Sequence, residues 1–249
     1  MLLTCLNHSV PSVQKLLKRG ASKTAGKNHT GRTTVFHMGG GHKRKKCFVD
    51  KNLGNAPVAG LIVSTNYTPY QSNTLSLIRV PLKEDPTTSL YFYSPSTHSI
   101  KDNSFLSFGG NAKSVGGNRT VLQNIPTGTL IHNVELYPAK GSCVARSAGT
   151  SCQVIRNDGS DKTLVKLPSG KTILLNSKCL ATIGICSNVS YKNQFLKKAG
   201  SARWLGVRPT VRGIAMNPVD HPHGGRTGGG RHPRTPWGKL TRGVKTRSR

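Results

Sequence analysis

The sequence predicts a mainly β fold in which two small barrels lie between two long, irregular, basic extensions. Short apolar and β-branched runs alternate with turn-forming residues through the middle of the chain, which is typical of strands. Positive charge gathers at the ends: residues 1–51 hold 11 Lys and Arg against one acid, residues 191–249 hold 14 against one, and residues 52–190 hold 12 against six. Only 35% of residues are hydrophobic, which favours modest cores.

The middle of the chain supplies the predicted strands. A glycine-rich run at 108–117 separates three strands from five, so it predicts the boundary between two barrels. We therefore expect a basic N-terminal extension over 1–51, barrels over 52–115 and 116–190, and a basic C-terminal extension over 191–249. The predicted strands are residues 56–65, 75–80, 89–93, 129–137, 152–156, 162–167, 171–175 and 180–185.

Local turn and helix signals are few. The runs Asn157-Asp158-Gly159 and Pro168-Ser169-Gly170 contain residues that tolerate turn dihedrals, so they predict two tight hairpins. One short helix is predicted over Lys192–Ala199, with Gly200 as its C-terminal cap.

The formal net charge of +29 indicates a polyanionic partner, with nucleic acid the leading candidate. Apolar runs such as residues 61–63 are far shorter than the roughly 20 residues that cross a bilayer, so we expect no membrane-spanning segment. Six Cys without a Cys-X-X-Cys pair predict reduced thiols and no zinc site. The first twenty residues fit either a transit peptide or a basic RNA-binding arm.

Residues 30–46 combine three consecutive glycines with four consecutive cations. Glycine lets a backbone approach phosphate closely, and the cations neutralise it, so this segment predicts RNA binding. A solvated linker and a nuclear-localisation signal are the alternatives. The candidate RNA-binding residues here are Arg32, His37, Gly39, Gly40, Gly41, His42, Lys43, Arg44, Lys45 and Lys46.

A second candidate segment interleaves arginines with Trp204. Arginine binds phosphate bidentately or stacks on bases, and the indole offers a flat face to an unpaired base. The alternative is that Trp204 anchors the arm to a barrel. The candidate residues are Arg203, Trp204, Arg208 and Arg212.

The next segment holds His221 and His223 close to Asp220, a pattern that suggests metal binding or acid–base chemistry. Pro222 is expected to keep the spacer extended so that the imidazoles diverge, which favours an RNA-packing loop instead. The basic tail beyond it carries one aromatic residue. The candidate RNA-binding residues of the loop and tail are Asn217, His221, His223, Arg226, Arg231, Trp237, Lys245 and Arg247.

Taken together, five blocks resemble the universal large-subunit ribosomal protein two, the L-two family. The blocks are GRTTVFHMGGGHKR, NIPTGTLIHNVELYPAKG, ARSAGT, KAGSARWLGVRPTVRGIAMNPVDHPHGG and TPWG with KTRSR. The third adds Arg146 to the candidate RNA-binding residues. The resemblance implies an OB-like barrel followed by an SH3-like barrel, with extensions threaded into large-subunit rRNA.

The resemblance also implies a function without enzymatic activity. Family members support assembly of the peptidyl-transferase region, tRNA binding and subunit association, while peptide-bond formation belongs to the RNA. The expected partners are large-subunit rRNA, neighbouring ribosomal proteins, the small subunit and tRNA. No cofactor is expected beyond magnesium ions associated with rRNA.

Some features depart from the family. Residues 224–231 carry cations where the family commonly has an acid, residues 87–115 follow the pattern loosely, and the ends are short. The low acid content, the abundant Ser and Asn and the short ends favour a mitochondrial ribosome, with a plastid or the bacterial cytoplasm as alternatives. Competing hypotheses are a free RNA chaperone or assembly factor, and metal-dependent hydrolysis at His221 and His223.

Overall fold

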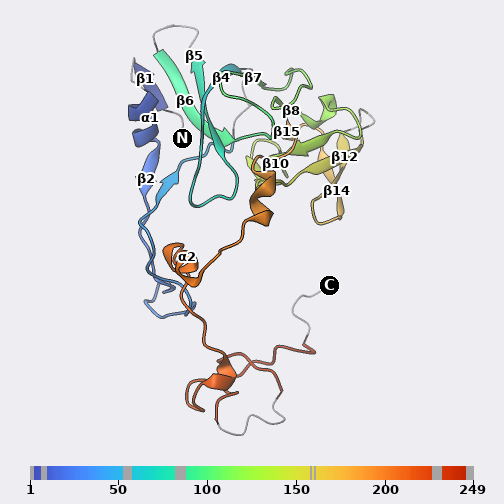
Figure 1. Cartoon of the computed structure of the whole chain (residues 1–249). Coiled ribbons are helices and arrows are strands. Elements are labelled where there is room, and N and C mark those ends of the chain that lie inside the picture. The colour runs from blue at the N-terminus through green and yellow to red at the C-terminus, as the bar shows by residue number, and fades with distance from the viewer. Residues whose placement is uncertain are drawn as a thin grey trace. The chain divides into compact units, whose positions relative to one another are not determined.

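The computed structural model describes residues 3–6, 10–52, 58–81, 88–157, 159, 161–225 and 232–244. The chain divides into two compact units (Figure 1). The first unit contains residues 1–21 and 43–195, and the second contains residues 22–42 and 196–249. The first unit is interrupted only by residues 22–42, whereas the second combines segments from both sides of residues 43–195.

The described part of the first unit contains one eleven-stranded sheet, in the order β1-β6-β5-β4-β7-β8-β15-β9-β12-β13-β14. Two ribbons, β2-β3 and β10-β11, accompany it. The mainly β prediction is therefore confirmed. The strands are β1 (Leu3–Leu6), β2 (Lys18–Gly20), β3 (Lys45–Cys47), β4 (Val58–Asn66), β5 (Leu75–Pro81), β6 (Thr88–Pro95), β7 (Phe105–Phe108), β8 (Arg119–Val121), β9 (Leu130–His132), β10 (Val134–Glu135), β11 (Ser142–Val144), β12 (Cys152–Arg156), β13 (Lys162–Lys166), β14 (Thr172–Asn176) and β15 (Leu180–Ile183).

The glycine-rich run at 108–117 lies between β7 and β8, which pair in parallel through Phe108 and Arg119. Buried side chains form separate clusters on the two sides of this crossover. One side is packed around Ile62, Ile78 and Phe92, and the other around Ile131 and Val165. The OB-like and SH3-like barrel types, and the boundaries at 52–115 and 116–190, stay a prediction.

The N-terminal segment is more ordered than the irregular extension expected from its charge. The helix α1 (Val10–Leu16) buries Val13, and Leu17 follows it, both against Leu75 and Tyr93. Val10, Val13 and Leu17 share one face of the helix, a stripe of only two turns that gives a weak periodic signal in the sequence. β1 pairs antiparallel with β6, so this segment is part of the first unit.

The hairpin predicted at Pro168-Ser169-Gly170 is confirmed. Gly170 has a φ of +86°, and the amide of Leu167 donates to the carbonyl of Lys171 at 2.8 Å. β12 and β13 form the other predicted hairpin, although Asp158 lies outside the described residues. The predicted strand 129–137 is divided into β9 and β10 because Asn133 adopts a φ of +51°.

Helices are short in both units. The predicted helix over Lys192–Ala199 is wrong, because Gln194–Lys198 is irregular and α2 (Ala199–Trp204) begins where the predicted helix ends. No helix of the described ranges is long and apolar enough to cross a membrane. The 3-10 helices are η1 (Leu122–Asn124), η2 (Val189–Asn193) and η3 (Gly213–Ala215).

A buried ion pair lies where the two parts of the sheet meet. The Arg119 guanidinium donates to Glu135 Oε1 at 3.0 Å and to the Asn133 carbonyl at 3.3 Å. The other Glu135 oxygen accepts the Leu180 amide at 3.2 Å. Burial lowers the pKa of Arg119, and the Glu135 carboxylate opposes that shift. The pair thereby joins β8, β10 and β15.

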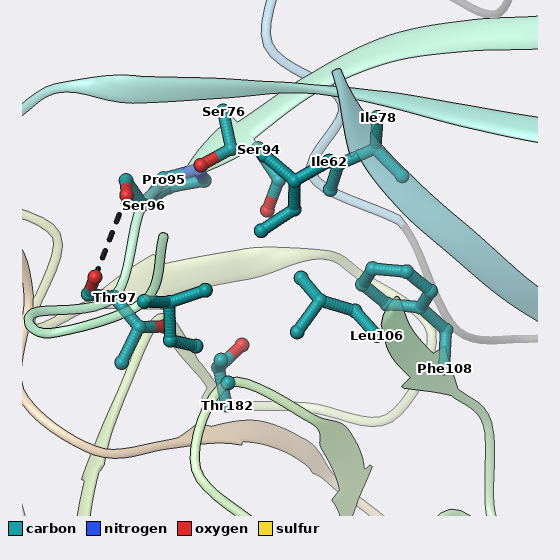
Figure 2. A pocket seen from close by; sticks show the side chains of 12 residues that line it. Ile62, Ser76, Ile78, Ser94, Pro95, Ser96, Thr97, Leu106, Phe108 and Thr182 are labelled. Atoms are coloured by element: carbon teal, nitrogen blue, oxygen red, sulfur yellow. Dashed lines mark hydrogen bonds between the residues drawn. The ribbon is translucent and has the colours of Figure 1, made fainter. Parts of the chain in front are cut away.

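A small cavity adjoins the same junction. Figure 2 shows that its lining mixes apolar side chains, such as those of Ile62, Leu106 and Phe108, with hydroxyl groups, such as those of Ser94 and Thr182. Its volume is about 10 Å³, room for about one water molecule. This cavity is too small to be a ligand site for anything larger.

Replacing Glu135 with Gln is expected to destabilise the first unit by about 3–5 kcal/mol, because the Arg119 guanidinium would lose its buried counter-charge. Denaturant unfolding of the isolated chain measures the change. The double variant Arg119→Met with Glu135→Leu, which buries no charge, should recover much of the loss. Equal stability of the single variant and the native chain would contradict this role.

The stability of the first unit should also fall in acid through His132. This ring is fully buried, its Nδ1–H donates to the Gly184 carbonyl at 3.2 Å, and burial lowers its pKa from 6.5 to about 4. Between these values the unfolded chain binds a proton that the folded chain excludes, so stability decreases as pH falls through this window.

The expected loss attributable to His132 is on the order of 3 kcal/mol between pH 6.5 and pH 4. Unfolding free energies measured across that range for the native chain and for His132→Gln test it. The variant should show a shallower slope, and identical slopes would assign the acid sensitivity to other groups.

Candidate nucleic-acid interface

The second unit carries a large excess of positive charge on very little core. Its sequence contains 16 Lys and Arg against one acid, Asp220. Among its described residues only Gly26, His221 and Gly224 are buried. Hydrophobic burial therefore contributes little to its folding, and the mutual repulsion of its cations favours contact with a polyanion.

Backbone hydrogen bonds join the two basic segments that the sequence analysis treated as separate. Met38 and Val207 form an antiparallel bridge, and the Gly39 amide donates to the Gly206 carbonyl at 3.0 Å. The Arg208 amide donates to the His37 carbonyl at 2.8 Å. The candidate residues within 32–42 and 203–212 thus belong to one unit.

The glycine run allows this close approach. Gly41 has a φ of +72°, and a Cβ on it would lie 2.6 Å from both the Gly206 nitrogen and the Trp204 oxygen. The Lys23 ammonium donates to the carbonyls of Gly40 and Gly41, each at 2.6 Å. Gly41 is therefore required for packing between chain segments, and its expected approach to phosphate stays a prediction. Lys23 was not among the residues predicted from the sequence.

The end of α2 explains why the helix boundary was predicted wrongly. Gly206 has a φ of +88°, and its amide donates to the Arg203 carbonyl, while the Val207 amide donates to the Ala202 carbonyl. This pair of hydrogen bonds is a Schellman motif, which places the terminating glycine at 206. Gly200 instead lies inside the helix.

Trp204 presents an accessible ring at the end of this helix. Its side chain is 62% exposed, and Lys198 Nζ lies 5.1 Å from the ring centroid. A cation beside an exposed indole can neutralise the phosphate of a nucleotide whose base stacks on the ring. Arg203, Arg208 and Arg212 are exposed in the same unit.

The histidine loop is fixed by its own backbone. The Asn217 carbonyl accepts the amides of Asp220 and His221, and a Cβ on Gly224 would lie 2.3 Å from that same oxygen. His221 is buried, and a Cβ on Gly213 would lie 2.6 Å from its ring. Glycines at these two positions thus allow a tight loop to close around one imidazole.

The two imidazoles were expected to diverge, but in the structure they lie close together. Their centroids are 4.7 Å apart, because residues 221–223 turn and the His223 amide donates to His221 Nδ1 at 3.0 Å. His223 Nε2 in turn accepts the Arg234 amide at 2.9 Å. Each ring therefore has one nitrogen that accepts a hydrogen bond from a backbone amide of the protein. No cluster of three or more metal-ligating side chains occurs in the parts of the chain that the structure describes.

Buried cysteines offer no alternative reactive site. The thiols of Cys47, Cys143, Cys152, Cys179 and Cys186 are free. Burial raises the pKa of Cys152, Cys179 and Cys186 to about 11, so these thiols are protonated and weakly nucleophilic at neutral pH.

The first unit also carries exposed cations on β2 and β3. The predicted RNA-binding residues included only some of them. β2 and β3 pair so that Arg19 lies directly opposite Lys46, and both are exposed. Like charges in register destabilise a ribbon unless an anion neutralises them. Lys46 Nζ also lies 5.2 Å from the Tyr70 ring. Arg19 was therefore a missed candidate, hidden by the ambiguity of the N-terminal segment.

The remaining candidates differ in exposure. Arg146 is half-buried, Asn217 is exposed, and Trp237 is 71% exposed in a turn closed by the bridge between Arg234 and Leu240. Exposed candidates in the glycine-rich and basic segments are Arg32, His37, Gly40, Gly41, His42, Lys43 and Lys45, whereas Gly39, Arg44 and His223 are half-buried. Arg226, Arg231, Lys245 and Arg247 lie outside the described residues.

Substituting Gly41 with Ala should separate the two paired segments of the second unit, because the new methyl group would collide with backbone atoms at 2.6 Å. Hydrogen exchange of the His42 amide, which donates to the Trp204 carbonyl, should accelerate at least about tenfold. Gly40→Ala is the matched control, since its φ is also positive but no atom lies within 4 Å of the added Cβ. Equal acceleration in both variants would refute the steric explanation.

Comparison with known proteins agrees with this geometry. The family model described as "Ribosomal Proteins L2, RNA binding N-terminal domain" matches residues 14–97, and "Ribosomal Proteins L2, C-terminal domain" matches residues 115–238. Large ribosomal subunit protein uL2 of Wolbachia pipientis wMel is 44% identical over 252 residues, which cover 100% of this chain and 89% of the relative.

Two further relatives show a similar degree of likeness. Protein uL2m of Reclinomonas americana is 44% identical over 94% of this chain and 84% of its own length. Protein uL2 of the Wolbachia of Brugia malayi, strain TRS, is 46% identical over 95% of this chain and 85% of its own length. With both domains matched in order and nearly the whole chain aligned, the chain belongs to the ribosomal protein L2 family.

Proposed function

We propose that this chain is a structural constituent of the large ribosomal subunit and binds large-subunit rRNA. The observation that carries the proposal is the second unit, which contains 16 cations and one acid and, among its described residues, almost no buried side chains. Such a unit is stabilised when phosphates neutralise its charge. The names of the relatives, all large-subunit proteins, support the same role.

The geometry of the interface indicates different roles for its residues. Exposed lysines and arginines neutralise phosphates, while the Trp204 ring stacks on an unpaired base and fixes position. The loop around His221 is closed by its own hydrogen bonds, so it acts as a shaped support. This role requires no enzymatic activity of the chain.

In the assembled ribosome, we expect this support to assist formation of the peptidyl-transferase region, tRNA binding and association with the small subunit. The finer proposal is a mitochondrial ribosome, supported by the low acid content of the chain together with the mitochondrial relative. We also propose that the chain consists of two barrels, at 52–115 and 116–190, between basic extensions at 1–51 and 191–249.

The chain should sediment with large subunits purified from mitochondria, at one copy per subunit by mass spectrometry, and remain bound in moderately high salt. The bound extensions should neutralise on the order of ten phosphates, so binding to an rRNA fragment should weaken by several log units per log unit of salt. Recovery only in lighter precursor particles would favour an assembly factor. Recovery with bacterial or plastid ribosomes would refute the compartment alone.

Trp204→Ala should weaken binding to large-subunit rRNA by about 5- to 150-fold, corresponding to about 1–3 kcal/mol for one stacked base. The control is Tyr137→Ala in the first unit, because Tyr137 is also 62% exposed and also lies beside a lysine, Lys140 Nζ at 4.8 Å. Filter binding at fixed salt measures both. Equal losses would show that a general surface effect, and not stacking at Trp204, determines affinity.

A further inference from the structure

The outer face of the antiparallel strands β12, β13 and β14 carries an apolar row that the proposed rRNA interface does not use. On the inner face Val154, Val165 and Leu175 pack into the core. On the outer face Ile155 is 42% exposed and Leu174 is 65% exposed. Exposure of large aliphatic side chains on an ordered sheet indicates a surface that binds something.

Strand register aligns these side chains across the sheet. Leu164 lies directly opposite Leu174, and a bulge in β12 brings Ile155 and Arg156 to the position opposite Leu164. The row therefore runs across all three strands. The flanking rows are polar: Gln153, Lys166 and Thr172 are in register on one side, and Lys162 and Asn176 on the other.

The surroundings of this apolar row are basic. Residues 152–178 contain five Lys and Arg against two Asp, and Lys162, Lys166 and Lys171 are exposed. A complementary partner brings aliphatic side chains to the row and carboxylates to its rim.

The face also borders a sheet edge. β14 is the last strand in the sheet order of the described residues, and it forms the yellow hairpin labelled in Figure 1. An extended segment can add to such an edge through backbone hydrogen bonds, placing alternate side chains beside Leu174.

We propose that β14 and the row Ile155, Leu164 and Leu174 bind an extended, acidic segment of a neighbouring protein, which adds as a strand to the sheet. An RNA occupant is disfavoured because the row is aliphatic, whereas bases stack on aromatic or guanidinium faces. A second copy of this chain is disfavoured because pairing two such edges brings two basic rims together. The inference goes beyond the proposed function and uses a different surface.

The experiment places the photoreactive residue p-benzoylphenylalanine at position 174 of the full chain, with irradiation of intact cells before fractionation. The expected adduct is one protein segment with more Asp and Glu than Lys and Arg. Phe105 in β7, also a large exposed apolar strand residue, is the control position and should not yield that adduct. Placement at Trp204, expected to yield rRNA adducts, verifies the photochemistry.

Variants then test the chemistry of the surface. Leu174→Ser and Lys166→Glu should each lower the amount of the acidic partner per chain at least fivefold, Lys166→Arg should retain it, and Phe105→Ser should leave it unchanged. Unfolding midpoints of the isolated variants should match the native chain because both side chains are exposed. Adducts to rRNA or to a second copy, or no adduct while position 204 reacts, would overturn the proposal.

These readouts separate the two proposals. Absence of the chain from large subunits would refute the proposed function, and an acidic adduct at position 174 in that case would still support the docking surface. Normal incorporation into large subunits without that adduct would refute the docking surface alone.

Discussion

The buried ion pair between Arg119 and Glu135 is the interaction on which the arrangement of β8, β10 and the start of β15 depends. It lies beside the single parallel contact between β7 and β8, because Arg119 is also the residue that pairs with Phe108. A hydrophobic contact could fill the same space but would not satisfy the Asn133 carbonyl and the Leu180 amide. The backbone pairing of Phe108 with Arg119 makes the strands on both sides of the glycine-rich run parts of one sheet.

The second unit follows a different physical principle. Its segments are held by main-chain hydrogen bonds, by the Schellman motif that ends α2, and by glycines whose missing side chains permit close approach. Because few apolar side chains are buried among its described residues, the folded second unit has a small free energy of unfolding. Repulsion between its cations makes that stability depend on a polyanion. Because few side chains are buried, Trp204 and the arginines are exposed and available for binding.

The L2 family relationship accounts for the basic extensions, whereas the outer face of β12, β13 and β14 has the features of a protein contact. Basic and aromatic groups suit phosphates and bases, but an aliphatic row such as Leu164 and Leu174 offers neither charge nor a π face. The molecule thus presents two surfaces of different chemistry. Ribosomal proteins that contact both RNA and protein require such a separation.

The sequence by itself determined most strands of the middle segment, the turn at Pro168-Ser169-Gly170 and the concentration of charge at the ends, because alternation, turn propensity and charge are local properties. It missed β7, β8, β11 and α1, which are short and carry too few apolar residues for a clear periodicity. Only the tertiary structure paired residues 37–42 with 204–208, buried His221 against Gly213, and aligned Leu164 with Leu174. Those contacts join segments that are distant in the sequence. Because every non-proline residue has the same backbone donor and acceptor, the order of side chains does not reveal which backbone groups form hydrogen bonds.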